Sequence, residues 1–260
     1  MAKYKRNYLT SVIVRLDFTI PPSDIDRELP DELAKKIARD FPTPATPVDC
    51  VQRLIAMNPT GNLQVPTTER WKRWDFYTAR RDRFLRIERD FYCIQYKKYQ
   101  SFQTLKTDFR GVLNLMAEAF PDVTYRRLGL RYVDTFSFPH EENPLDWRRW
   151  IAAKLLAPLA VPSAKDRQAI CRAMQNLELN CDGVRLRFQY GIPNPDYPSP
   201  VRQKQFVFDT DVFCEGLLEP SDMEPKLNKF HEIADQYFED HITAEMRRHL
   251  NAPRSRRKSR

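Results

Sequence analysis

The stretch Ile87-Glu88-Arg89-Asp90-Phe91-Tyr92-Cys93 is echoed later in the chain by Phe208-Asp209-Thr210-Asp211-Val212-Phe213-Cys214. In this pairing acids align with acids, apolar residues mostly align with apolar residues, and Cys93 aligns with Cys214. The same spacing lays residues 81–129 over residues 202–250 without a gap, and it aligns Phe109 with Phe230. We therefore predict that the chain contains a duplicated unit.

Hydrophobic periodicity predicts the same order of elements in each half, because alternation every second residue indicates strands and i, i+3, i+4 spacing indicates helices. The first half is predicted to contain strands at 11–20 and 51–57, two or three strands within 71–99, and helices at 31–41 and 105–120. The second half is predicted to contain strands at 128–138 and 205–213, a hairpin at 177–190 turning at Asp182-Gly183, and helices at 143–159, 164–173 and 223–250. The expected class is α+β, with two tandem pseudo-repeats of β-α-β-β-β-α type and largely antiparallel sheets packed against long helices.

The predicted organisation has four parts. A basic N-terminal arm occupies residues 1–7, a first α+β unit 8–125, a second unit 126–250, and a basic tail 251–260 that its charge predicts to be disordered. The formal net charge of +8 comes from the two ends, since residues 7–253 are neutral overall. This location weakens the argument from a high net charge to a nucleic-acid-binding fold.

Composition excludes several classes of protein. No apolar run is long enough to cross a bilayer and no signal-type segment opens the chain, which predicts a cytoplasmic protein without a membrane partner. The five cysteines are odd in number and lack Cys-x-x-Cys spacing, which argues against a disulfide framework or a zinc site. The six glycines form neither a dinucleotide fingerprint nor a P-loop, so no cofactor is predicted.

Asp209 and Asp211 are the strongest candidates for a catalytic pair of carboxylates. At positions i and i+2 of a strand their side chains share one face, and two such carboxylates could hold Mg²⁺ for nuclease or phosphodiesterase chemistry. The alternative is a solvent-facing structural pair. We favour it because Glu88 and Asp90 form a similar pair in the other half.

Two patches interleave tryptophan with basic residues. They are Trp71-Lys72-Arg73-Trp74 and Trp147-Arg148-Arg149-Trp150, and further arginines lie at Arg81, Arg127 and Arg131. Aromatic rings stack on bases and arginines hold phosphates, so these residues are the candidate nucleic-acid-binding set. The competing interpretation, which we favour, buries each tryptophan and leaves the basic residues in solvent.

The segments Arg127 to Tyr132, which read R-x-G-L-R-Y, and Phe208 to Phe213, which read F-D-x-D-V-F, are a recognisable pair. They resemble a sporadically distributed prokaryotic family of similar length that has no assigned function. The resemblance covers nearly the whole chain except its ends. It implies no catalytic residues, and it suggests an association with defence or mobile-element systems.

The sequence therefore predicts a non-catalytic cytoplasmic binding or assembly protein, an accessory of a prokaryotic system that pairs with a protein partner or with itself. Duplicated sheets would supply edge strands and clefts for such partners. One alternative is a nucleic-acid-binding protein that uses the Trp/Arg patches and the basic tails. Another is a metal-dependent nuclease or phosphodiesterase centred on Asp209 and Asp211.

Overall fold

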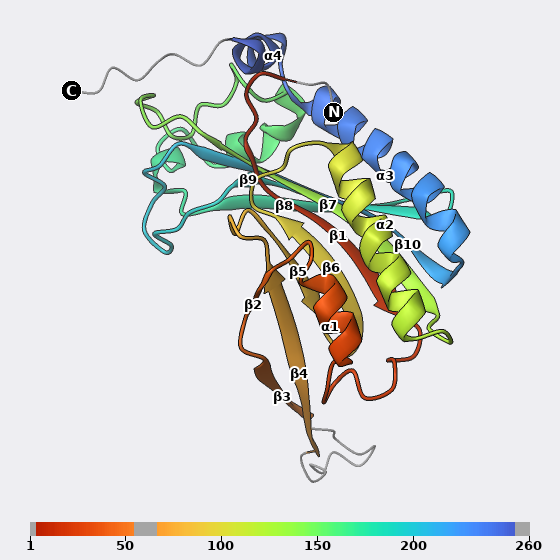
Figure 1. The fold of residues 1–260 in the computed structure, drawn as a ribbon. Helices are drawn as coiled ribbons and strands as arrows, with labels where there is room; N and C mark the ends of the chain where they lie inside the picture. The colour runs from red at the N-terminus through yellow and green to blue at the C-terminus, as the bar shows by residue number, and fades with distance from the viewer. Residues whose placement is uncertain (1–3, 55–66, 253–260) are drawn as a thin grey trace, which may run out of the picture. The chain divides into compact units, whose positions relative to one another are not determined.

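The computed structural model of the protein describes residues 4–54 and 67–252 (Figure 1). The described part combines a large β-sheet with four α-helices and three short 3₁₀ helices. None of its helices has the length and apolar character that crossing a membrane requires.

The strands follow the order β2-β4-β5-β6-β1-β7-β10-β9-β8, and β3 pairs with β4. Antiparallel pairing joins β2, β3 and β5 to β4, β6 to β5, and both β8 and β10 to β9. The coarse prediction of an α+β fold with a large antiparallel sheet is thus confirmed. The strands are β1 (Leu9–Phe18), β2 (Thr43–Pro44), β3 (Val48–Leu54), β4 (Thr67–Tyr77), β5 (Arg83–Ile87), β6 (Phe91–Tyr96), β7 (Tyr125–Ser137), β8 (Ala173–Cys181), β9 (Val184–Ile192) and β10 (Gln205–Leu218).

The chain forms two compact units. We call Ile13–Leu128 with Glu215–Met223 the N-terminal unit, and Gly129–Cys214 with the flanking segments up to Val12 and from Glu224 the C-terminal unit. The N-terminal unit holds helices α1 (Asp31–Ile37) and α2 (Phe102–Ala119). The C-terminal unit holds most of α3 (Pro220–His241) and all of α4 (Ala244–Asn251).

The N-terminal unit buries the apolar stripe of α2 against its strands. Phe109 is 3 % exposed, and its ring lies 6.4 Å from that of Tyr92 on β6. The helix begins where the Ser101 side chain accepts a hydrogen bond from the Thr104 amide at 3.1 Å, an N-cap that satisfies a free helix-end donor. Arg81, with φ of 51°, lies in the turn between β4 and β5.

The C-terminal unit has an aromatic core. Phe208 on β10 lies at its centre and meets the rings of Phe136, Phe188, Phe206 and Phe238 at centroid distances of 5.1–6.3 Å. Phe230 of α3 is fully buried, as the sequence predicts. Edge-to-face and tilted arrangements of such rings add specific attraction to the burial of apolar surface.

The predicted single helix at 223–250 is wrong. It divides into α3 and α4 because Thr243 adopts an extended conformation and its side chain accepts a hydrogen bond from the Met246 amide at 3.1 Å. Ile242, just before this cap, forms an isolated antiparallel bridge with Ile151. A new N-cap therefore starts a second helix where the apolar periodicity alone continues.

The predicted helices at 143–159 and 164–173 are also wrong. This region consists of turns and the 3₁₀ helices η1 (Ala153–Leu155), η2 (Ala157–Ala160) and η3 (Arg167–Ala169). Trp147 and Trp150 are buried there, 0 % and 4 % exposed, and the Trp147 indole donates to the Pro144 carbonyl at 3.0 Å. Three prolines limit helical hydrogen bonding in the segment, because each lacks a backbone donor.

The gap-free alignment of 81–129 with 202–250 does not extend over its full length. Residues 83–87 form the separate strand β5, whereas all of their counterparts at 204–208 except Lys204 belong to the long strand β10. Asp90 lies in the turn between β5 and β6, while Asp211 lies inside β10. Residues 244–251 form α4, whereas their counterparts at 123–130 lead into β7. The elements correspond only over 91–119 and 212–240.

The described part of the N-terminal arm packs on the C-terminal unit. The Tyr4 hydroxyl donates to Glu239 on α3 at 2.6 Å, and the Tyr8 hydroxyl lies 2.8 Å from Nε2 of His249 on α4. The predicted disordered tail at 251–260 lies outside the described residues from 253 onward. The predicted strand at 51–57 likewise leaves the described range after residue 54.

Candidate functional site

The first Trp/Arg patch, Trp71-Lys72-Arg73-Trp74, lies on β4, where successive side chains point to opposite faces. The Trp71 indole approaches Glu88 at 3.4 Å, whereas the Trp74 indole donates to the Ile25 carbonyl at 3.1 Å. Arg73 forms an ion pair with Asp75 at 3.3 Å. Lys72 lies 6.0 Å from the Trp74 ring, and Arg81 lies 4.9 Å from the Tyr77 ring. The alternation of the strand divides the patch between its two faces.

The second patch lies in the C-terminal unit. Its tryptophans are buried, and the guanidinium groups beside them are already paired. Arg148 binds Asp146 at 2.8 Å and Arg149 binds Glu245 at 2.7 Å. Hydrogen bonding to Arg148 lowers the pKa of Asp146 to about 2, so this pair stays ionised at neutral pH. The interpretation that buries the rings describes this patch.

Arg131 and Asp209 face each other on β7 and β10. The Arg131 Nε donates to Asp209 at 2.7 Å, and a second guanidinium nitrogen binds the other carboxylate oxygen. This bidentate bond raises the pKa of Arg131. Asp211 lies opposite Arg187 in the β9–β10 register, and Arg127 lies on β7. The acids thus face basic partners, and among the described residues no cluster of three His, Cys, Asp or Glu side chains could hold a metal ion.

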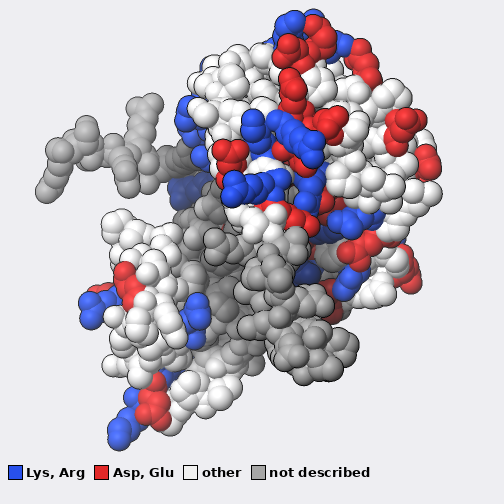
Figure 2. Space-filling model, turned by 90° about the horizontal axis from the view of Figure 1, so that it is seen from below, with Lys and Arg blue, Asp and Glu red and all other residues white. Residues whose placement is uncertain are grey.

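Acidic and basic side chains are interleaved on the face shown in Figure 2. In the N-terminal unit Arg86 pairs with Asp75 at 2.8 Å and Arg89 with Glu69 at 2.9 Å. A surface that binds nucleic acid presents clustered lysines and arginines whose charges are not paired with carboxylates. Many arginines of both units instead form ion pairs with neighbouring carboxylates.

Cys93 lies close to basic groups on β6, but its environment does not activate it. Burial raises the pKa of the Cys93 thiol to about 12, despite the opposing effects of Arg86 and Arg15. The thiolate is the nucleophilic form of cysteine, and it is absent at neutral pH when the pKa is so high. Cys93 is therefore a core side chain.

A concave surface lies in the C-terminal unit, between the turns after β7 and the 3₁₀ helices. Two adjoining cavities of about 600 Å³ and 210 Å³ share Asn143, Leu145 and Arg167. We call this the 142–168 cleft. Its apolar lining comes from Pro144, Leu145, Trp147, Leu156, Leu159, Ala160, Ala164 and Val201, and its polar lining from Glu142, Asn143, Asp146, Arg148, Arg167 and Gln168.

Leu145, Leu156 and Leu159 are partly exposed, and they pack on the aromatic core beneath the cleft. Arg167, at the start of η3, is exposed and lines both cavities. Its guanidinium group forms no ion pair with any side chain in the described ranges 4–54 and 67–252, unlike that of Arg148 nearby. The cleft therefore combines partly exposed leucines with one arginine that forms no ion pair, and the carboxylate of Glu142 lines the same cavity.

Lys204, just before β10, holds together the turns at 141–146 that line the cleft. Only 3 % of its side chain is exposed, and its ammonium group binds Glu141 at 2.7 Å and the Asn143 carbonyl at 3.0 Å. It also donates to the carbonyl of Asp146 and lies 5.3 Å from the Trp147 ring. A buried ammonium needs such partners, because desolvating an unpaired charge is costly. One lysine thus joins the turns that carry Leu145 and Trp147.

We expect Lys204→Met to lower the free energy of unfolding by about 3 kcal/mol, because Glu141 and two carbonyl groups lose their shared cation. Urea denaturation followed by tryptophan fluorescence measures this change. The control is Lys229→Met on the exposed surface of α3, which should stay within about 0.5 kcal/mol of the native protein. Equal stabilities of the two variants would contradict the role of Lys204.

The sequence reasoning missed both Lys204 and the cleft. A signal for Lys204 is present in the alternation of Lys204, Phe206 and Phe208, which places the lysine on the inward face of the strand. The cleft has no comparable signal, since it is made by turns that local periodicity describes as helices. The chain matches no protein-family model and no curated protein, so its function is argued from these residues.

Proposed function

We propose that the protein is a non-catalytic binding or assembly protein that recognises an acidic, leucine-rich segment of a partner protein in the 142–168 cleft. The observation that carries the proposal is the position of the unpaired Arg167 beside the half-exposed side chains of Leu145, Leu156 and Leu159. Apolar surface supplies affinity, and one unpaired cation at its rim selects a carboxylate.

The lining of the cleft favours binding over catalysis. No histidine, cysteine, serine, lysine or tyrosine is among its lining residues, and the groups that could act as a general base there are the carboxylates of Glu142 and Asp146. Asp146, the lining carboxylate with a perturbed pKa, is held ionised by Arg148. These residues suit the recognition of a peptide.

A nucleic-acid-binding role has weaker support. Most of the arginines that suggested it are paired with acids or lie over protein aromatic rings, as for Arg73 with Asp75 and Arg131 with Asp209. The nuclease alternative would require Asp209 to leave Arg131 before it could bind a metal ion. Five free cysteines support a reducing compartment such as the cytoplasm, where disulfides are rare.

Fluorescence anisotropy tests the proposal with three labelled probes: a peptide of alternating Leu and Glu pairs, the same peptide with Lys for Glu, and a single-stranded oligonucleotide. We expect the acidic peptide to bind best. Arg167→Glu should weaken its binding about tenfold or more, because repulsion replaces attraction. Lys229→Glu makes the same charge change on the exposed surface of α3 and should leave binding nearly unchanged.

Preference for the oligonucleotide would favour the nucleic-acid alternative. Equal binding of the two peptides, or equal effects of Arg167→Glu and Lys229→Glu, would contradict recognition of an acidic peptide by the 142–168 cleft. Circular dichroism of each variant checks that the fold is retained. Both arginine and lysine positions are exposed, so neither substitution buries a charge.

We also propose that the two halves are tandem pseudo-repeats, of which only the first has an α-helix between its first strand and the strands that follow, since 3₁₀ helices take that place in the second. The strand order supports this. In the sets β4-β5-β6-β1 and β8-β9-β10-β7, three strands that follow one another in the chain are succeeded, toward the middle of the sheet, by the first strand of their half. Helix α2 follows β6 and helix α3 follows β10. Each helix buries an equivalent phenylalanine, Phe109 in α2 and Phe230 in α3. Cys93 and Cys214 are both buried at matching positions of β6 and β10.

A further inference from the structure

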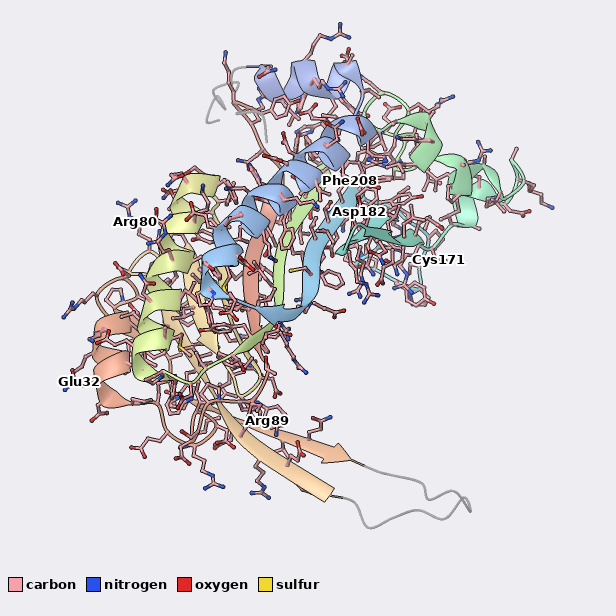
Figure 3. All side chains as sticks on the ribbon, turned by 90° about the vertical axis from the view of Figure 1, so that its right-hand side faces the viewer. Glu32, Arg80, Arg89, Cys171, Asp182 and Phe208 are labelled. Atoms are coloured by element: carbon pink, nitrogen blue, oxygen red, sulfur yellow. The ribbon has the colours of Figure 1, made fainter. Side chains whose placement is uncertain are left out.

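Strand β8 ends the sheet, and one of its edges is open. All nine of its residues pair with β9, from Ala173 opposite Ile192 to Cys181 opposite Val184. In the strand order of the described residues β8 has no neighbour on its other side. An open edge exposes a row of backbone donors and acceptors that can pair with another strand. Figure 3 shows this hairpin, with Asp182 labelled in its turn and Cys171 just before β8.

The composition of β8 lacks the features that usually protect an edge. Its sequence, Ala-Met-Gln-Asn-Leu-Glu-Leu-Asn-Cys, contains no lysine, arginine or proline. The single charge, Glu178, is bound by Arg185 and Arg187 of β9. Natural edge strands carry lysines, prolines or bulges that prevent pairing between molecules. The strand at the other end of the order does so, with Pro44 in β2.

Two apolar side chains of β8 are exposed. Leu177 is 48 % exposed and Met174 is 38 % exposed. Leu177 lies directly opposite Phe188 of β9, whose ring packs against Tyr237 of α3 at 5.7 Å. Since directly opposite residues share one face of a sheet, an added strand would extend the apolar face of the C-terminal unit.

The edge is also complementary to itself. If two copies of β8 run antiparallel about an axis at Leu177, Leu177 meets its own copy, Gln175 meets Leu179, and Asn176 meets Glu178. Met174 then lies opposite Asn180, and Ala173 opposite Cys181. No position places two like charges opposite each other. Antiparallel pairing with identical patches on both sides is the geometry of a two-fold dimer.

We propose that the protein forms a two-fold symmetric dimer in which β8 pairs antiparallel with β8 of a second copy, centred on Leu177. The sheet then continues from one subunit into the other. This assembly uses a different surface from the 142–168 cleft, so it stands or fails independently of the proposed peptide recognition.

Sedimentation velocity of the full chain over a dilution series tests the dimer. We expect a concentration-dependent dimer that Leu177→Lys dissociates, because two ammonium groups would meet at the axis, with a rise in Kd of about tenfold or more. The control is Leu217→Lys on β10, which is 72 % exposed and lies away from the β8 edge. It should leave the dimer intact.

A mixture of the Leu177→Lys and Leu177→Glu proteins provides the decisive complementation. Each variant alone should be monomeric, and the mixture should form heterodimers because opposite charges then meet at the axis. A Leu177→Cys variant on a Cys181→Ser background should also form a disulfide-linked dimer on oxidation. A native protein that stays monomeric, a dimer that survives Leu177→Lys, or failure of the mixture to dimerise would overturn the proposal.

Discussion

Phe208→Ala is expected to lower the free energy of unfolding by about 4 kcal/mol, within the usual range for truncating a buried phenylalanine. The side chain is 1 % exposed and lies at the centre of the aromatic core of the C-terminal unit. Its removal forfeits the burial of the ring and leaves a cavity among Phe136, Phe188 and Phe206. Rigid rings on three sides collapse poorly into such a space, so little of the loss is recovered. Urea denaturation measures the change.

Leu217→Ala is the matched control for this substitution. Leu217 lies on the same strand but is 72 % exposed, so its truncation should cost about 0.5 kcal/mol or less. A loss below about 1 kcal/mol for Phe208→Ala would mean that the strand does not present this residue to the core.

Asp134→Asn should stabilise the protein at alkaline pH. Asp134 is 4 % exposed on β7, and its carboxyl group has no hydrogen-bond or ion-pair partner among the residues that the structure describes. Burial raises its pKa from 3.8 to about 7. The folded protein therefore holds a proton that the unfolded chain releases, and stability falls as the pH rises from about 4 to 7.

The full penalty of about 4 kcal/mol is present above pH 7, because each unit of pKa shift corresponds to about 1.4 kcal/mol. Asparagine cannot ionise, so the stability difference between the variant and the native protein should grow from near zero at acid pH to this value at pH 8. Urea denaturation at a series of pH values gives this difference, in which the other carboxyl groups cancel.

Asp75→Asn provides the contrast. Asp75 is buried to a similar extent, 5 % exposed, but Arg86 donates to its carboxylate at 2.8 Å. Its substitution should destabilise the protein at pH 8 by about 2 kcal/mol, because a charge-assisted hydrogen bond is lost. If Asp134→Asn is no more stable than the native protein at pH 8, Asp134 is not a desolvated carboxylate.

Strand alternation and turn chemistry predicted a large part of the fold. The Asp182-Gly183 turn forms with both residues at positive φ, as its hairpin signal requires, and Phe109 and Phe230 are buried on their helices. The same alternation places two charged residue types, Lys204 and Asp134, at buried positions. Lys204 precedes Phe206 and Phe208, and Asp134 lies between Tyr132 and Phe136, at inward positions of their strands.

The parts that sequence reasoning missed depend on contacts between distant segments. Trp147 and Trp150 have helical spacing, but their rings are held by Pro144, Glu141 and the aromatic core, and the chain forms turns instead. Local periodicity carries no information on those partners. The candidate Trp/Arg residues on β4 are divided between two faces, because a strand sends neighbouring side chains to opposite faces.

We expect an acidic, leucine-rich peptide to enter the 142–168 cleft. The four tryptophans offer a direct test, since each indole N–H gives its own NMR signal, and Trp147 lines the cleft while Trp71 and Trp74 lie on β4 of the N-terminal unit. Titration of the ¹⁵N-labelled protein with the Leu/Glu peptide should shift the Trp147 signal and leave those of Trp71 and Trp74 in place, and Arg167→Glu should abolish the shift. Shifts confined to Trp71 and Trp74, or no shift at saturating peptide, would contradict the account.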